Sequence, residues 1–249
     1  MLLRLASRFL PPARTMISLP AAGACYNGFI MHDVNSILQI IAVALLPVLF
    51  AIVVHEVAHG WVAKQLGDQT AALLGRLTLN PFKHIDPIGT ILVPIIMIAT
   101  VGFAFGWAKP VPIDWRNLRN PRRDMVLVAV AGPAANLLMA IGWGIILKLA
   151  SLLPAGLTQI AVPLALMGQI GITINIVLMV FNLFPLPPLD GGRVAVGLLP
   201  PNLAQPLARL EPYGFIIILI LLATGLLWQG IGPLVNAATR FIMLLTGNT

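Results

Sequence analysis

The sequence predicts an all-α membrane protein that crosses the bilayer about four times. Its 249 residues are 59% hydrophobic and 9% charged, with a mean hydropathy of +0.95, whereas soluble domains carry about a quarter charged residues. Several apolar runs approach or exceed the ~20 residues that a helix needs to cross a bilayer. These runs are continuous rather than alternating, which argues against a membrane β-barrel. The length suits one membrane domain, residues 31–249, without a large soluble module.

The first 30 residues differ from the rest. Residues 1–30 contain three Arg and no acidic residue, and three interpretations are open. They could be a targeting segment, although Pro11 and Pro12 break its apolar core. They could form a lipoprotein-like site ending at Cys25, for which AGAC is a weak match. The third interpretation, which we favour slightly, is that translation starts at Met31. We therefore expect this extension to be disordered or not part of the native start.

Two apolar segments precede a basic loop. The first predicted span covers residues 34–66 and continues as a helix to Gly67. Residues 68–86 mix polar and β-prone residues, which predicts a short hairpin with LGRLTLN as its strand. Residues 87–107 are apolar but interrupted by Pro94 and several Gly, so they either cross the membrane or enter it and return.

The remaining chain alternates between polar connections and apolar runs. The basic loop 108–124 is expected on the cytoplasmic side because positive loops stay there. The net charge of +7 thus indicates membrane topology and anionic lipid rather than nucleic acid. Further spans are predicted at 125–150, 161–184 and 213–232, and the tail 233–247 is expected to lie in the membrane interface.

The sequence IVVHEVAHGWVAKQ places two His and one Glu near the end of the first span. Positions four apart lie on one helix face, so His55 and His59 can direct both imidazoles at one ion. Glu56 is one step round the helix, close enough to reach a water on that ion. Zinc suits such ligands. The chain has only two Glu, so a metal site is favoured over interfacial histidines that reach toward water.

A catalytic zinc site usually has three protein ligands. Asp190 is a good candidate because it stands at the end of an apolar helix, in NLFPLPPLDGG. Its Pro and Gly prevent a regular helix and leave backbone groups unpaired at membrane depth. The alternative is an ordinary turn with a capping Asp. The other candidates lie in or beside polar segments: Asp33, Asp68, His84, Asp86, Asp114, Asp124 and Glu211.

HEVAH, AGPAAN and NLFPLPPLDGG together resemble the site-2 protease family of intramembrane zinc metalloproteases, specifically its compact bacterial members without a PDZ domain. The resemblance covers roughly residues 34–200. It implies that one zinc ion is held by His55, His59 and Asp190. The other residues that it implies are the general base Glu56 and the substrate-binding Asn182 and Asn136, of which Asn182 is the better placed.

The resemblance also implies an activity and a location. We expect hydrolysis of peptide bonds in or near the transmembrane segments of other membrane proteins, in the bacterial inner membrane. The expected partners are transmembrane protein substrates and the lipid bilayer. The LGRLTLN segment could pair with an unwound substrate as an added strand. HIDPIG and AKPVP look like features of the same subgroup, without an assigned chemical role.

The ligands restrict the topology. The histidines lie in the C-terminal part of the first span, and Asp190 lies at the C-terminal end of the span 161–184. These two spans should therefore run parallel. Only one full crossing can then lie between them, and we expect 87–107 to return to the side from which it entered. The active site would face the cytoplasm together with the Arg-rich loop. A full crossing at 87–107, with ligands meeting at mid-depth, is the alternative.

Two other classes of function remain open on the sequence. Broken helices and a buried Asp also mark ion pathways in transporters and channels. A membrane scaffold with a structural metal is the third possibility. A Glu56→Gln variant separates them, since only a protease should keep its metal and lose peptide cleavage.

Overall fold

The structure is a computed structural model that describes residues 34–100 and 106–248. Within these ranges every regular element is a helix and no strand occurs, so the predicted helical class is confirmed. The extension 1–30, with its three interpretations, lies outside the described residues.

Three helices are long and apolar enough to cross a membrane: α3 (Val34–Gln65), α6 (Pro121–Ser151) and α7 (Thr158–Asn182). At 1.5 Å per residue, each exceeds the ~30 Å of a bilayer's hydrocarbon core. Large apolar side chains remain exposed on their outer faces, including Leu38 and Leu138. A lipid environment would cover such faces, which water would not tolerate in this number.

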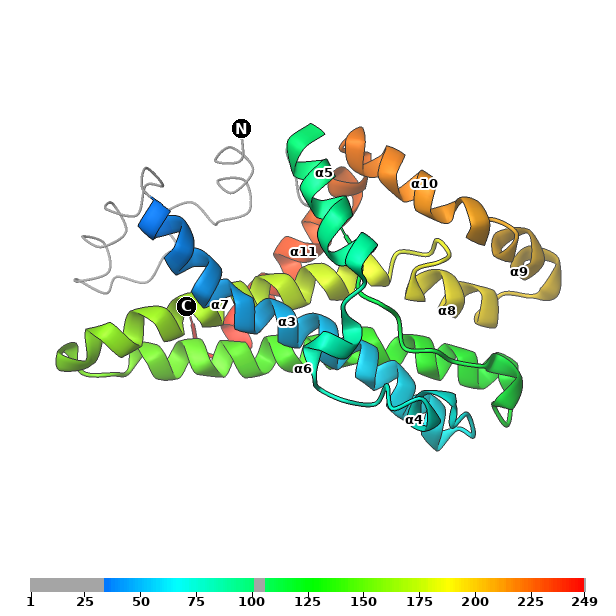
Figure 1. Cartoon of the computed structure of the whole chain (residues 1–249), viewed down its shortest axis with the longest axis horizontal. Helices are drawn as coiled ribbons and strands as arrows, with labels where there is room; N and C mark the ends of the chain where they lie inside the picture. Colours follow the sequence, from blue (N-terminus) through cyan, green and yellow to red (C-terminus); the bar gives the residue numbers. More distant parts are fainter. Residues whose placement is uncertain (1–33, 101–105, 249) are drawn as a thin grey trace.

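The three long helices form the framework of the molecule. Helices α6 and α7 run antiparallel through the short turn η5 (Ala155–Leu157), and α3 lies across them in the same general direction as α7 (Figure 1). The main core lies between α6, α7 and α11 (Leu226–Leu245) and contains Leu147, Ile172, Ile176 and Ile242. The part of α3 that carries His55 and His59 therefore lies close to Asp190, which follows the C-terminal end of α7.

The region beyond residue 190 is divided differently from the prediction. It forms α8 (Asp190–Leu198), α9 (Pro201–Ala208), α10 (Glu211–Ala223) and α11. The predicted span 213–232 is interrupted at Gly225, which adopts φ +76° and ends the helix. A fourth crossing requires α9 and α10, which meet at a 68° bend, to act as one span. Residues 233–247 belong mainly to α11, whose Val235 and Ile242 are buried in the core.

The predicted hairpin at 68–86 is wrong. The segment contains one helical turn, α4 (Thr70–Leu73), and a 3-10 turn, η2 (Pro81–His84), joined by irregular chain. A glycine with positive φ, Gly75, follows the helical turn. The Arg76 side chain reaches the neighbouring AKPVP stretch and donates to the carbonyls of Lys109 and Pro110. That stretch contains two Pro without N–H groups, so it offers a poor edge for a β ladder.

Residues 87–107 form an excursion whose two ends lie side by side and of which 101–105 are outside the described residues. They begin with η3 (Pro87–Leu92) and α5 (Val93–Thr100), which projects away from the α6–α7 pair (Figure 1). The backbone N–H of Trp107 donates to the carbonyl of Gly89 at 3.1 Å, and that of Lys109 to His84 at 2.9 Å. A Cβ at Gly89 would lie 2.5 Å from the Trp107 indole. HIDPIG and AKPVP thus have a structural role, because they join the two ends of this excursion.

Asp68 ties the end of α3 to the basic loop. Its side chain is fully buried and accepts hydrogen bonds from the backbone N–H of Asp114 at 2.9 Å and from the Asn117 amide at 3.1 Å. The Thr70 hydroxyl and backbone N–H also donate to it. Burial alone would raise the pKa of Asp68, but these hydrogen bonds together lower it below its usual value.

Replacing Asp68 with Asn should destabilise the protein by about 1.5–3 kcal/mol at neutral pH, the usual worth of hydrogen bonds to a charged group. Because the folded pKa is lowered, the carboxylate stabilises the fold above its unfolded pKa. This contribution disappears as pH falls through the folded pKa. Thermal unfolding in detergent is measured from neutral to acidic pH. The stability difference between the wild type and Asp68→Asn should narrow below about pH 4. Asp114→Asn is the matched control, since its ion pair with Arg116 is exposed. An equal loss of stability in Asp68→Asn and Asp114→Asn would contradict the prediction.

Candidate metal centre

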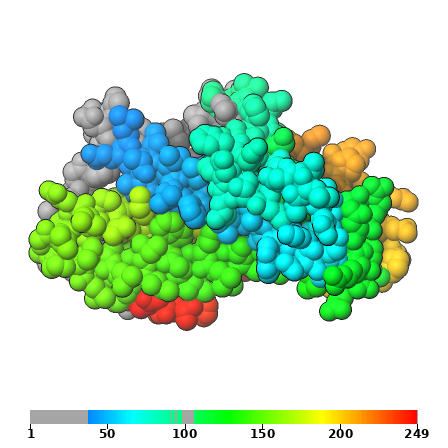
Figure 2. Space-filling model, turned by 60° about the horizontal axis from the view of Figure 1, so that its bottom comes forward, coloured from blue at the N-terminus to red at the C-terminus, as the bar shows by residue number. Residues whose placement is uncertain are grey.

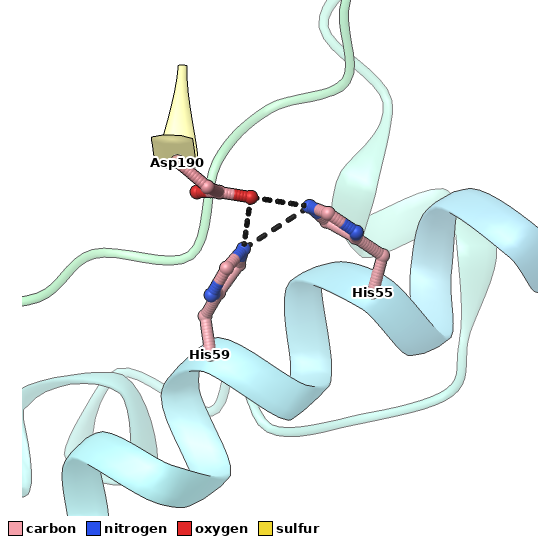
Figure 3. A group of neighbouring side chains, drawn as sticks. All are labelled: His55, His59 and Asp190. Carbon is pink, nitrogen blue, oxygen red and sulfur yellow. Dashed lines mark hydrogen bonds and ion pairs between the residues drawn. The ribbon is translucent and has the colours of Figure 1, made fainter. Parts of the chain in front are cut away.

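Helix α3 presents two imidazoles to one point. His55 and His59 are each 7% exposed and lie one helical turn apart, with their Nε2 atoms 3.1 Å from one another (Figure 3). The Nδ1 of His59 is 2.7 Å from the backbone carbonyl of Val128. The Nδ1 of His55 is 2.5 Å from Oδ1 of Asn136. Both acceptors lie on α6, so α6 orients the two rings that α3 carries.

Asp190 reaches the same point from the far end of α7. The PLPPLDGG stretch folds back after α7, and α8 begins at Asp190. This tight return needs small residues, since a Cβ at Gly191 would lie 2.6 Å from the carbonyl of Phe184, and one at Gly192 2.6 Å from the Cα of Pro187. The Oδ2 atom of Asp190 consequently lies 3.2 Å from the Nε2 of both histidines (Figure 3).

Helix α8 is held against the start of α6. Arg122 on α6 donates through its Nε to the carbonyl of Gly197 at 2.9 Å, and through a second nitrogen to the carbonyl of Leu199. Arg193 lies over the Trp115 ring, 4.9 Å from its centre. The carboxylate of Asp190 is thus delivered by a short helix that is fixed at both ends.

The hydrogen bonds define the chemistry of the three converging atoms. A backbone carbonyl only accepts, so Nδ1 of His59 carries its proton and Nε2 presents a lone pair. The same holds for His55, because Asn136 offers its oxygen. Oδ2 of Asp190 is buried and has no hydrogen-bond donor. Three electron-pair donors at close range repel one another unless a cation joins them. The atoms lie within 4.8 Å of one another, close enough to hold one metal ion.

Zinc fits this donor set. Two imidazole nitrogens and one carboxylate oxygen are typical ligands of a catalytic zinc site, which keeps a further position open. Ligands about 2.0–2.1 Å from a tetrahedral zinc are roughly 3.3 Å apart. The observed separations of 3.1 and 3.2 Å are close to that spacing. The second shell also has the usual form, since each imidazole donates its other N–H to an oxygen.

Gly132 makes room for the two rings. It lies on α6 in the AGPAAN motif, and a Cβ there would be 2.5 Å from Cε1 of His55 and 2.6 Å from Cε1 of His59. No real Cβ approaches other atoms so closely, so any side chain at this position would displace the imidazoles. The motif therefore contributes a close helix contact as well as the Asn136 acceptor.

Glu56 is anchored beside the histidines. Its Oε2 accepts a hydrogen bond from the backbone N–H of Val111 at 2.8 Å, and the residue is half-buried. Val111 stands between Pro110 and Pro112 in AKPVP, and the side chain of Val111 packs against Gly60 on α3. The returning end of the excursion therefore positions the carboxylate that follows His55.

The two predicted substrate residues occupy different settings. Asn136 is fully buried, and both of its N–H groups are used, by the carbonyl of Ala51 and by Asn175. The structure thus surrounds Asn136 with protein and joins it to His55. Asn182 is the last residue of α7, half-buried, and donates to the carbonyl of Leu178 at 3.0 Å.

The other predicted ligand candidates that the structure describes make contacts away from the metal centre. Asp68 and Asp114 belong to the basic-loop contacts, Asp124 accepts from the backbone of Asn120, and Glu211 pairs with Arg193. Asp86 caps η3, and His84 lies next to the carbonyl of Thr78. Asp33 lies outside the described residues. Asp190 is the candidate that the structure brings to the histidines.

Sequence reasoning missed four contributors to this centre. They are the ring-orienting carbonyl of Val128, the close contact at Gly132, the Val111 N–H and the amide of Asn175. Val128 and Val111 act through backbone groups, which the identity of a side chain does not indicate. Asn175 could have been noticed, because it is an isolated amide within the apolar run of α7.

Helices suited to a membrane and a buried His–His–Asp cluster define a class, the membrane-bound zinc metalloproteases. Curated relatives bear this out. The chain is 40% identical over 209 residues to "Putative zinc metalloprotease YwhC" of Bacillus subtilis, covering 84% of this chain and 92% of that protein. It is 31% identical over 235 residues to "Putative zinc metalloprotease Rip2" of Mycolicibacterium smegmatis, covering 89% and 83%.

The chain belongs to the site-2 protease family of zinc metalloproteases. The Rip2 protein of Mycobacterium tuberculosis is a further relative, 28% identical over 177 residues, with 70% of this chain and 63% of that protein aligned. No protein-family profile and no solved structure matches the chain. The family and the cluster agree on zinc as the cofactor.

Proposed function

We propose that this metalloprotease acts within the membrane and cleaves peptide bonds in or near the transmembrane segments of other membrane proteins. The observation that carries the proposal is the position of the metal cluster. Two of its three residues lie inside α3, a helix long and apolar enough to cross the bilayer. A hydrolytic centre in such a helix is accessible to substrates that share the membrane.

In this proposal His55, His59 and Asp190 hold one zinc ion. When bound, zinc supplies a Lewis acid that polarises the scissile carbonyl and makes water more acidic. The protein's part is to keep three lone pairs directed at one point. Asn136 and Val128 do this for the rings, and Arg122 does it for the helix that carries Asp190.

Glu56 is proposed as the general base. Its carboxylate takes a proton from the attacking water, whose oxygen bonds to the acyl carbon of the scissile amide. Glu56 then returns the proton to the amide nitrogen as the C–N bond breaks, so that a carboxylic acid and an amine result. The hydrogen bond from Val111 to Oε2 holds the carboxylate in one orientation.

An apolar groove offers a path for the substrate. It is lined by Leu46, Leu49, Phe50, Val53 and Val54 of α3 and by Leu79 and Pro81 of the following segment. Val54 directly precedes His55 in the sequence. In the space-filling view the residues that follow α3, cyan to turquoise, lie beside the blue N-terminal part of α3 on the same face of the molecule (Figure 2). Asn182 is proposed to bond the substrate backbone at the C-terminal end of α7.

The topology also belongs to the proposal. Helices α3 and α7 run in the same direction with α6 between them in the chain, and the excursion 87–107 returns to its starting point. The basic segment at the start of α6, with Arg116 and Arg119 before the helix and Arg122 and Arg123 in its first turn, would then be on the same side as the active site. By the positive-inside rule that side is the cytoplasm. The proposed location is the bacterial inner membrane.

Cleavage of a defined reporter tests the proposal. The full-length protein and a single-span reporter with a Leu-rich helix are placed in liposomes with zinc, and cut positions are mapped by mass spectrometry. A Gly-Pro pair in the reporter helix exposes its amides, and we expect cleavage there at least about tenfold faster than in an uninterrupted helix. A zinc chelator should stop cleavage and added zinc should restore it. Cleavage confined to soluble proteins such as casein would overturn the proposal.

A further inference from the structure

Asn175 is an amide in the interior of an apolar helix. It is fully buried in α7 next to Ile172 and Ile176 of the core. Its side-chain N–H donates to the carbonyl of Gly171 at 2.8 Å, within its own helix. That bond uses one N–H of the amide, and the hydroxyl of Thr173 bonds in the same way to the carbonyl of Gln169. Its oxygen has a separate use.

The oxygen of Asn175 begins a directed chain of hydrogen bonds that ends at the metal centre. It accepts an N–H of Asn136 at 2.9 Å. The second N–H of Asn136 donates to the carbonyl of Ala51 at 3.2 Å, and its oxygen faces Nδ1 of His55 at 2.5 Å. Every member of the chain is buried, so each bond acts without competition from water.

The directions of these hydrogen bonds allow only one orientation of the Asn136 amide. If the amide were flipped by about 180°, its NH2 group would face the N–H of His55. Its oxygen would then face the oxygens of Ala51 and Asn175, acceptor against acceptor. Asn175 cannot turn to compensate, because its own NH2 is committed to Gly171. Buried polar groups without hydrogen bonds destabilise a protein. The series of hydrogen bonds from Asn175 through Asn136 therefore keeps the proton of His55 on Nδ1.

We propose that Asn175 is a positioning residue for the metal centre: through Asn136 it fixes the ring orientation and tautomer of His55, so that the Nε2 lone pair points to the zinc position. This inference rests on the proposed zinc ligands. Partners that orient a metal-bound imidazole typically change metal affinity by 10–100-fold when they are removed. Asn175 lies one residue further from the metal than such partners, and acts by holding one of them.

The test is zinc affinity of the full-length protein, measured by competition with a chelator of known affinity. Asn175→Thr keeps a hydroxyl for the Gly171 carbonyl but is too short to reach Asn136. We expect its zinc affinity to fall at least tenfold, with a changed visible spectrum of the cobalt-substituted protein. Asn175→Asp should restore most of the affinity, because burial favours a neutral carboxyl, whose O–H can donate to Gly171 while its other oxygen accepts from Asn136.

Thr173→Val is the matched control, since Thr173 makes the same type of bond on the same helix without contact to Asn136. A purely structural role for Asn175 predicts lower thermal stability of the metal-free protein with unchanged zinc affinity. Zinc binding by Asn175→Thr within threefold of the wild type would overturn the inference and leave the proposed function standing. Failure of the wild-type protein to bind zinc would overturn both.

Discussion

Replacing Glu56 with Gln is expected to abolish peptide hydrolysis while zinc stays bound. General acid–base catalysis by a positioned side chain contributes about 10²–10⁴-fold to a rate, and an amide cannot take the proton. The Gln oxygen can still accept the hydrogen bond from Val111, so the side chain should keep its place. Cleavage of the Gly-Pro reporter and zinc content of the same purified sample provide the measurement.

Glu211→Gln is the control for this experiment, because Glu211 is the other Glu in the chain. Its side chain is 50% exposed and pairs with Arg193, an interaction worth at most about 1 kcal/mol at a surface. Reporter cleavage within about threefold of the wild type is expected for this variant. A Glu56→Gln protein that still cleaves at a comparable rate would remove Glu56 from the mechanism. It would also reopen the transporter and scaffold interpretations of the same cluster.

Adding a single methyl group at Gly132 should disable the metal centre. The Cβ of Gly132→Ala would fall 2.5–2.6 Å from carbons of both imidazoles, so α6 must move away or the rings must turn. Either change separates Nε2 of His55 and His59 from Asp190. We expect at least a hundredfold loss of zinc affinity, the upper range for disturbing atoms that orient ligands, and a matching loss of reporter cleavage.

Gly142→Ala is the matched control on the same helix. A Cβ at Gly142 meets nothing within 4 Å, and Ala favours a helix over Gly by about 1 kcal/mol. This variant should keep full zinc affinity and should be as stable as the wild type or slightly more stable. If Gly132→Ala bound zinc as tightly as Gly142→Ala, the close contact between α6 and the histidines would have to be abandoned.

The metal cluster was predictable because its spacing follows from helix geometry. His55 and His59 share a face wherever the helix lies, and Asp190 stood out directly after a Pro-rich stretch that interrupts the helices on either side. The helical class was predictable for a similar reason, since apolar runs of this length leave few other structures. These inferences depend on the local sequence and on the bilayer, and they do not depend on the tertiary packing.

The hairpin prediction was wrong because the structure of that segment depends on the segment that packs beside it. LGRLTLN has the composition of a strand, but a strand needs a neighbour with free N–H groups, and the adjacent AKPVP contains two Pro. The interfacial position of residues 233–247 stays a prediction, but the sequence did not indicate that Val235 and Ile242 pack against α6 and α7. Such packing partners cannot be found from the segment itself.

The role of Asn136 shows a different limit. The AGPAAN motif indicated a polar residue near the active site, and the contact of Asn136 with substrate stays a prediction. The hydrogen bonds that Asn136 makes depend on which way its amide points, and that follows from Ala51, Asn175 and His55 together. Hydrogen-bond direction is a property of the assembled network, so sequence spacing cannot give it.

The separation of the metal-binding residues along the chain has a consequence for biosynthesis. More than one hundred positions lie between His59 and Asp190, and the carboxylate arrives only after α6 and α7 have formed a pair. A ribosome therefore inserts most of this polypeptide before its hydrolytic apparatus can exist. During that interval the nascent protein has no complete metal centre with which to hydrolyse a peptide bond.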